Sequence, residues 1–174
     1  MTRQLLTILW LNLAALVLIA PAVYAKGNDH PDKTATTIDS AATRAEVLKI
    51  VNTVIKASGT FDMDAVANLY TPNALIADEE PPFSWNGSTA GVQWVSTVEK
   101  TCKEFKLRDF KGKVGRISVY LQTEESVYLV VPVNYTAQIK GDPFEEDGAF
   151  TFVLRMANGS WLIKSQVWVA RRAM

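Results

Sequence analysis

The sequence has little of the two side chains that most often carry enzyme chemistry, cysteine and histidine. Cys102 is the single cysteine and His30 the single histidine among 174 residues. One cysteine cannot form an intramolecular disulfide, so stability must come from packing. A thiol nucleophile needs a base close by, and His30 lies in a polar N-terminal segment. Cys–His and Ser–His–Asp arrangements and histidine-rich metal sites are therefore disfavoured.

The sequence also lacks an excess of charge of either sign. Lys and Arg number 18, Asp and Glu number 18, and no basic run forms a stripe. Phosphate binding needs a concentrated basic surface, so no nucleic-acid partner is expected. The acidic run Asp78, Glu79 and Glu80 alternates sides if it is extended, which does not suit a metal site. We expect neither a metal nor a cofactor.

The N-terminal residues have the pattern of an export signal. Arg3 precedes an apolar run over residues 5–20, and small residues follow at Val23 and Ala25. The run is shorter than the ~20 residues that span a bilayer. Residues 1–25 are therefore predicted to be a cleavable signal peptide, with an uncleaved N-terminal anchor as the alternative. The mature protein is then periplasmic or secreted, without a membrane partner.

After the leader, a polar stretch over residues 26–40 is predicted to be a flexible linker. Residues 41–172 then form one domain, in which helical periodicity precedes β periodicity. Apolar residues spaced by three and four predict a helix from Ser40 to Gly59. A short helix at residues 62–70 and a third from about 88 to 107 follow. Strands are predicted at residues 74–78, 83–85, 114–121, 127–139, 149–156 and 161–170.

Short connections between the late strands require antiparallel pairing. Pro132 lies inside the longest predicted strand and cannot donate to a ladder, so we expect a bulge or bend there. The predicted fold class is α+β, with three N-terminal helices packed on one face of a curved, mainly antiparallel sheet.

Three local patterns agree with a known family. These are an acidic-started segment from Asp62 to Ile76, Asn86-Gly87 before a helix, and a turn followed by Trp161 and Ile163. In this order the chain resembles the nuclear transport factor 2-like superfamily, in particular its SnoaL-like and ketosteroid isomerase-like branch. The resemblance implies a cone-shaped α+β barrel enclosing a cavity, and often a homodimer formed through the outer sheet face. It also implies either cofactor-free proton transfer or ligand binding alone.

The resemblance selects candidate catalytic residues. In the isomerase relatives a carboxylate at the end of the first strand removes a proton beside a carbonyl, and the matching position is Asp78. A carboxylate facing an apolar cavity has a raised pKa and can act as a general base. The matching oxyanion donor position is Asn52, with Tyr70 as the alternative donor. The late-strand donor of the isomerases is not reproduced at Thr151 or Phe152, so that reaction itself is not expected.

The same comparison selects candidate ligand-binding residues. Tyr70, Trp85 and Trp94 are expected to rim the cavity, with packing in the core as the alternative. Ser165 and Val167 occupy the expected inward positions of the last strand.

Three functions remain open. The first is an exported domain that binds a small hydrophobic ligand without catalysis. The second is an isomerase, cyclase or dehydratase that uses Asp78 as base. The third is an interaction or dimerisation module.

Overall fold

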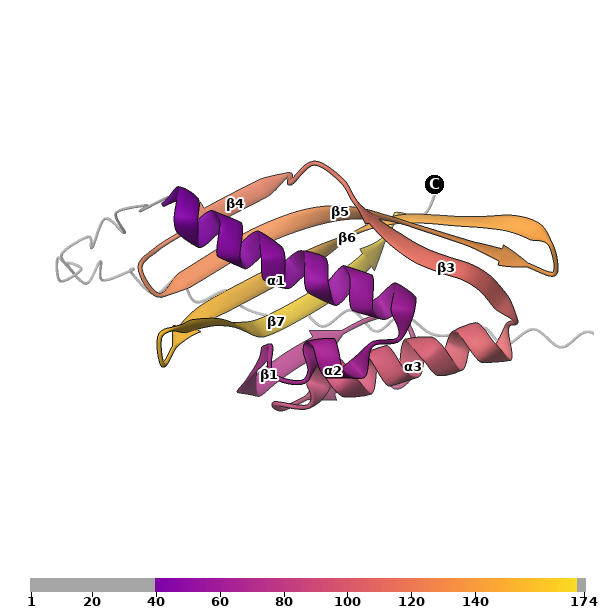
Figure 1. Cartoon of the computed structure of the whole chain (residues 1–174), viewed down its shortest axis with the longest axis horizontal. Coiled ribbons are helices and arrows are strands. Elements are labelled where there is room, and N and C mark those ends of the chain that lie inside the picture. The colour runs from indigo at the N-terminus through magenta and orange to yellow at the C-terminus, as the bar shows by residue number, and fades with distance from the viewer. Residues whose placement is uncertain (1–39, 172–174) are drawn as a thin grey trace, which may run out of the picture. The chain divides into compact units, whose positions relative to one another are not determined.

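The computed structural model describes residues 40–171, which form three helices and a seven-stranded sheet (Figure 1). The predicted signal peptide and nearly all of the predicted linker lie outside the described residues. Among the described residues, no helix is long and apolar enough to cross a bilayer. In chain order the elements are α1 (Ala41–Thr60), α2 (Met63–Val66), β1 (Tyr70–Ala77), β2 (Ser84–Asn86), α3 (Ala90–Glu104), β3 (Leu107–Val114), β4 (Val119–Gln122), β5 (Ser126–Ile139), β6 (Asp142–Ala157) and β7 (Ser160–Ala170).

The first helix begins and ends where local chemistry requires it. The Ser40 hydroxyl accepts a hydrogen bond from the Thr43 amide at 3.1 Å, which satisfies one of the free N–H groups of the first turn. The helix ends at Phe61, whose left-handed conformation (φ 57°) closes it. The predicted apolar stripe is confirmed, because Val47, Val51 and Val54 are fully buried.

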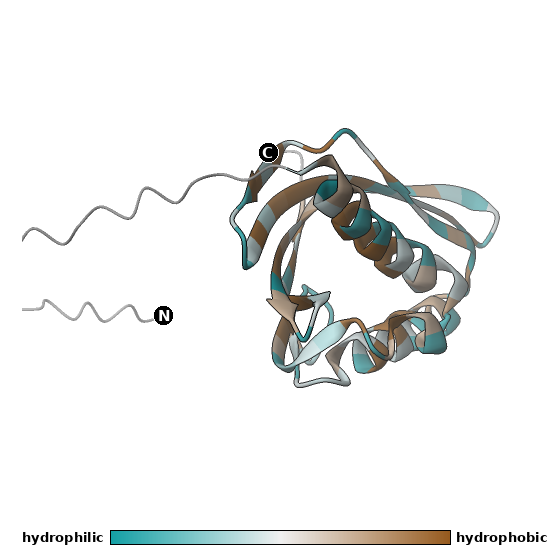
Figure 2. Cartoon of the chain, turned by 60° about the vertical axis from the view of Figure 1, so that its left-hand side comes forward, coloured by the Kyte–Doolittle hydropathy of each residue, from teal (hydrophilic) through white to brown (hydrophobic). Residues whose placement is uncertain are grey.

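The sheet has the strand order β2-β1-β7-β6-β5-β3, and β4 also pairs with β5. The pair β1–β7 is parallel, whereas the other described pairs are antiparallel. In Figure 2 the sheet curves around α1 without closing, and hydrophobic residues gather on its concave side. This confirms the predicted helices on a curved, mainly antiparallel sheet.

The late strands differ from the prediction in number and limits. Residues 114–121, predicted as one strand, are the end of β3 and the start of β4, and β3 begins directly after α3. Pro132 explains the break. Its carbonyl accepts from the Gly115 amide at 2.8 Å, so its nitrogen faces the same neighbouring strand and has no hydrogen to offer. The β5–β6 ladder continues in register through Pro132, so the expected bulge in that ladder is absent.

One prediction near the first strand is also wrong. The sequence predicts Tyr70 at the end of the second helix, but it is the first residue of β1, because α2 ends after one turn at Val66. The prediction of Asn86-Gly87 before a helix is confirmed. The β1–β2 connection is residues 78–83, and Gly87 (φ 89°) leads the chain from β2 into α3.

Candidate functional site

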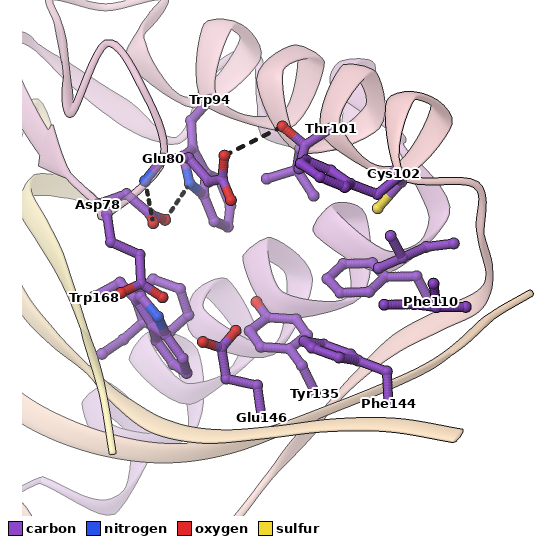
Figure 3. A pocket seen from close by; sticks show the side chains of 16 residues that line it. Asp78, Glu80, Trp94, Thr101, Cys102, Phe110, Tyr135, Phe144, Glu146 and Trp168 are labelled. Carbon is purple, nitrogen blue, oxygen red and sulfur yellow. Dashed lines mark hydrogen bonds between the residues drawn. The ribbon is translucent and has the colours of Figure 1, made fainter. Parts of the chain in front are cut away.

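A pocket of about 260 Å³ opens between α3 and the concave face of the sheet, at the end where β1 meets the β1–β2 connection (Figure 3). Its volume is close to the lower limit of about 300 Å³ that is common for small-molecule sites. Side chains from α3, from the β1–β2 connection and from the long strands converge on it. The lining residues are Asp78, Glu79, Glu80, Trp94, Val98, Thr101, Cys102, Phe105, Leu107, Phe110, Tyr135, Ile139, Phe144, Glu146, Phe150 and Trp168.

Aromatic rings form a continuous wall of this pocket. Phe110 stacks on Tyr135 with 5.0 Å between ring centroids, and Tyr135 meets Trp168 edge to face at 5.5 Å. Trp168 then packs on Phe150 at 4.7 Å, and Phe150 on Trp94 at 5.8 Å. Edge-to-face and offset pairs of this kind contribute about 0.5–1.5 kcal/mol each beyond area burial. The wall is therefore fixed before any ligand arrives.

A glycine on β6 makes room for this wall. A Cβ atom at Gly148 would lie 2.3 Å from the Trp168 ring, so any other residue would push the ring out of place.

Asp78 lies directly after β1, at the strand end that the sequence predicted, and lines the pocket. The indole N–H of Trp94 donates to its Oδ2 at 2.8 Å, and the Glu80 amide donates to its Oδ1 at 3.4 Å. Burial raises the pKa of Asp78 above its ordinary value, although these hydrogen bonds act in the opposite direction. The carboxylate is thus held in one orientation and made more basic.

Glu146, on β6, is a second carboxyl group in the pocket. Figure 3 shows Glu146 on the sheet and Asp78 on the segment above it, both bordering the cavity. Burial, a hydrogen bond with Glu79, and the negative charges of Glu79, Asp78 and Glu80 raise the pKa of Glu146 to about 7. This residue therefore exchanges a proton near neutral pH.

Three hydrogen-bond donors of the pocket, on Trp94, Thr101 and Tyr135, make hydrogen bonds within the protein. Trp94 donates to Asp78, and the Thr101 hydroxyl donates to Glu80 at 3.4 Å. The Ser58 hydroxyl donates its one hydrogen to the Ile55 carbonyl at 2.8 Å, so Tyr135 is the donor in the 3.0 Å contact with Ser58. With their hydrogens used in this way, these groups offer a ligand hydrogen-bond acceptors and not donors.

Cys102 also lines the pocket, but it is not suited to nucleophilic chemistry. Burial raises the pKa of its thiol to about 11, with the nearby Glu80 charge as a second cause. A thiol in this environment stays protonated and behaves as a small apolar residue.

Three of the predicted site residues do not reach the pocket. Asn52 is exposed and its amide donates to the Leu48 carbonyl at 2.8 Å, because it follows the core-facing Val51 by about 100° around α1. Tyr70 is buried and donates to Gln166 at 2.7 Å. Trp85 is buried, and its indole N–H donates a hydrogen bond to the Thr97 hydroxyl at 3.2 Å. The core alternative therefore holds for both aromatics, and neither Asn52 nor Tyr70 is placed to donate to an oxyanion in the pocket.

Ser165 and Val167 also point the wrong way for the predicted role. Leu154 pairs with Ile163 but Val153 pairs with Ser165, so β7 carries one extra residue between the two positions. This β-bulge reverses the side-chain alternation. Trp161 and Ile163 are buried before it, and Gln166 and Trp168 after it. Ser165 and Val167 consequently lie on the outer face.

Sequence reasoning missed Glu146 and Trp168, and a signal existed for Glu146. It lies in step with Phe144, Phe150 and Phe152 along one strand, so alternation alone places a carboxyl on the apolar face. Among the described residues, no group of three or more His, Cys, Asp or Glu is arranged to hold a metal ion.

The architecture is shared with several solved structures. The domain superimposes on the hexachlorocyclohexane dehydrochlorinase LinA-type3 from Novosphingobium barchaimii LL02 with a TM-score of 0.65, at 13% identity over 75% of this chain and 88% of that one. The fold is nuclear transport factor 2-like. The nuclear transport factor 2-like cone, with its pocket at the open end of the sheet, thus agrees with the resemblance seen in the sequence.

Two further solved structures share this nuclear transport factor 2-like fold. A putative scytalone dehydratase from Novosphingobium aromaticivorans DSM 12444 has a TM-score of 0.60, at 11% identity over 75% of this chain and 85% of that one. Aln2 from a Streptomyces species has a TM-score of 0.61, at 12% identity over 76% and 93%. No protein-family model and no curated protein matches the sequence. Such identities support the fold alone.

Proposed function

We propose that this domain binds a small, largely apolar ligand in the pocket beneath α3, without transforming it. The observation that carries the proposal is the continuous aromatic wall from Phe110 to Trp94 around a cavity of about 260 Å³. Apolar walls with a few fixed polar groups are typical of ligand sites. The hydrogen bonds that Trp94, Thr101 and Tyr135 donate are internal, which argues against stabilisation of an oxyanion by these groups.

We further propose that the domain works after export. The support is the leader pattern of residues 1–25, which ends in small residues ahead of a polar stretch. The ligand would then be encountered in the periplasm or outside the cell. Fractionation of cells that express the full chain, with N-terminal sequencing of the product, tests this. A product that retains Met1 in the membrane fraction would support the anchor instead.

Binding is tested by filling the pocket. Val98 lines it, whereas Ser96 lies exposed on the same helix. Val98→Trp should abolish binding of small aromatic probes such as 2-naphthylmethanol in isothermal titration calorimetry. Ser96→Trp adds the same side chain on the solvent side and should leave binding unchanged. If the unmodified protein binds none of the aromatic probes, the ligand-binding proposal fails.

The second candidate is a cofactor-free proton-transfer enzyme. Asp78 is oriented by Trp94 and has a raised pKa, and Glu146 across the pocket has a pKa of about 7. Asp78 would accept a proton beside a carbonyl while protonated Glu146 donates a hydrogen bond to the oxygen, a division of roles known in ketosteroid isomerase. Glu146 here takes the place foreseen for Asn52 or Tyr70.

Loss of α-deuterium from a labelled cyclic aromatic ketone, followed by NMR, measures this reaction without knowledge of the natural substrate. Catalysed exchange that disappears in Asp78→Asn would favour the enzyme. Exchange that persists in Asp78→Asn would exclude Asp78 as the base.

The outer sheet face favours self-association as a third property. Val169, Leu75 and Tyr128 are 61%, 42% and 40% exposed on strands of the same sheet, and Val167 follows the same outward alternation as Val169. We propose a symmetric homodimer through this face. Sedimentation velocity should show a dimer that Val169→Lys dissociates, and an unmodified protein that stays monomeric at high concentration would contradict it.

A further inference from the structure

The charged residues that line the pocket, among those the structure describes, are all acidic. Four of its sixteen lining residues are carboxylic acids, namely Asp78, Glu79, Glu80 and Glu146. No Lys, Arg or His is among the described residues that line it. A concentration of acidic side chains would be ordinary on an exposed surface. Here it borders a cavity with an aromatic wall, where water screens charge less.

Burial, and to a lesser extent mutual repulsion, makes the ionised forms of these groups unfavourable. Burial and neighbouring negative charges raise the pKa of Asp78, of Glu80 and of Glu146. Each raised pKa means that the anionic form lacks sufficient compensation in the ligand-free protein. A positive charge placed among them would relieve this repulsion.

Hydrogen bonding points to the same kind of ligand. Trp94, Thr101 and Tyr135 already donate to protein acceptors, while the carboxyl oxygens of Asp78, Glu80 and Glu146 can each accept further hydrogen bonds. A ligand that only accepts hydrogen bonds would leave those acceptors unpaired, and an anionic ligand would add to the repulsion. A ligand that donates is matched to them.

The aromatic wall suits a cation as well as an apolar body. The rings of Trp94, Trp168 and Tyr135 border the pocket. A cation within about 6 Å of such a ring face is attracted by its quadrupole, most strongly for Trp. The carboxyl groups and the indole rings of the lining therefore favour the same charge.

We infer that the ligand of this pocket is a small organic cation, a protonated amine carried on one or two apolar rings, whose nitrogen lies between Asp78 and Glu146. The inference rests on the proposed binding function and specifies its ligand class. The apolar rings lie against the wall formed by Phe110, Phe150 and Trp168. The carboxyl groups accept the N–H bonds of the amine.

Binding of such a cation is linked to protonation of Glu146. Asp78, Glu79 and Glu80 face this carboxyl from the β1–β2 connection, and Tyr135 lies near it on β5. At pH 5.5 Glu146 is mostly protonated, and at pH 8 it is mostly ionised. An amine that stays charged over this range therefore binds more tightly at pH 8, and it releases a proton from the protein near pH 7.

The test compares three probes of one shape by isothermal titration calorimetry: 2-naphthylmethylamine, 2-naphthylmethanol and 2-naphthoate. At pH 8 the amine should bind about tenfold or more tightly than the alcohol, and the naphthoate most weakly. The preference for the amine should shrink at pH 5.5. Glu146→Gln and Asp78→Asn should each reduce it, with alcohol binding largely unchanged.

Glu145→Gln is the matched control, because it changes net charge equally but lies on the outer face with Asn134. It should leave the preference for the amine intact. Equal binding of amine and alcohol, or tightest binding of naphthoate, would overturn the ligand class while leaving ligand binding in place. If none of the three probes binds, both the proposed binding function and the proposed ligand class are contradicted.

Discussion

Replacement of Glu146 by Gln should make the domain more stable above neutral pH. The carboxyl group has a pKa of about 7 in the folded protein, against an ordinary value of 4.5. The folded state therefore holds its proton more tightly than the unfolded chain does. The stability that this proton contributes is complete below pH 4.5 and is lost as the pH rises through 7.

The size of the effect follows from the same two values. A pKa raised from 4.5 to about 7 corresponds to at most about 3.4 kcal/mol. Glu146 is only half-buried, and solvent screening reduces this to about 1–2 kcal/mol. Gln has the shape of the neutral carboxyl group and cannot ionise. The variant should match the unmodified protein near pH 4.5 and exceed its stability by about 1–2 kcal/mol at pH 8.

Urea denaturation at pH 5, 6, 7 and 8 measures the difference between the two proteins, and Glu145→Gln controls for net charge. A stability difference between Glu146→Gln and the unmodified protein that stays constant from pH 5 to 8 would refute the reasoning. So would a variant that is less stable at pH 8. Either result would mean that Glu146 does not experience the repulsion described here.

Three other expectations follow, one for the pocket and two for the core beside it. Trp94→Phe removes the donor that lowers the pKa of Asp78, so NMR titration should find that pKa higher still in the variant. Gly91→Ala should lower the free energy of unfolding in urea by about 1–3 kcal/mol, since its Cβ would lie 2.0 Å from the Tyr70 ring; an unchanged value would show that the ring moves freely. Tyr70→Phe should cost about 1–3 kcal/mol by leaving buried Gln166 unpaired, and adding Gln166→Met should recover most of that; strictly additive losses would contradict the coupling.

The order of helices and strands was predictable because periodicity reports burial directly. Val47, Val51 and Val54 recur at helical spacing, and the long strands alternate. The limits between elements were less predictable. Pro132 lies on β5 but interrupts the pairing of the neighbouring segment and not the β5–β6 ladder. It therefore separates β3 from β4, which the sequence predicts as one strand.

Asp78 was selected through the family resemblance, which places a carboxylate at the end of the first strand, and the order of residues along the chain is enough to find that position. The residues opposite it were not found in this way, since they depend on strand pairing. Ser165 and Val167 follow correctly from alternation counted from Trp161, but the extra residue in β7 inverts the count. Gln166 and Trp168 face the concave side for that reason, and no local feature of the sequence predicts the bulge.

The extra residue at Lys164 also bears on how such a domain can change over generations. Loss of one codon there would remove the bulge and leave the strand pairs on both sides of it in place, so Ile163, Gln166 and Trp168 would all still face the concave side. A single deletion at this position would thus leave the lining of the pocket unchanged. Loops are usually regarded as the place where length variation is harmless; the bulge provides such a place inside a strand.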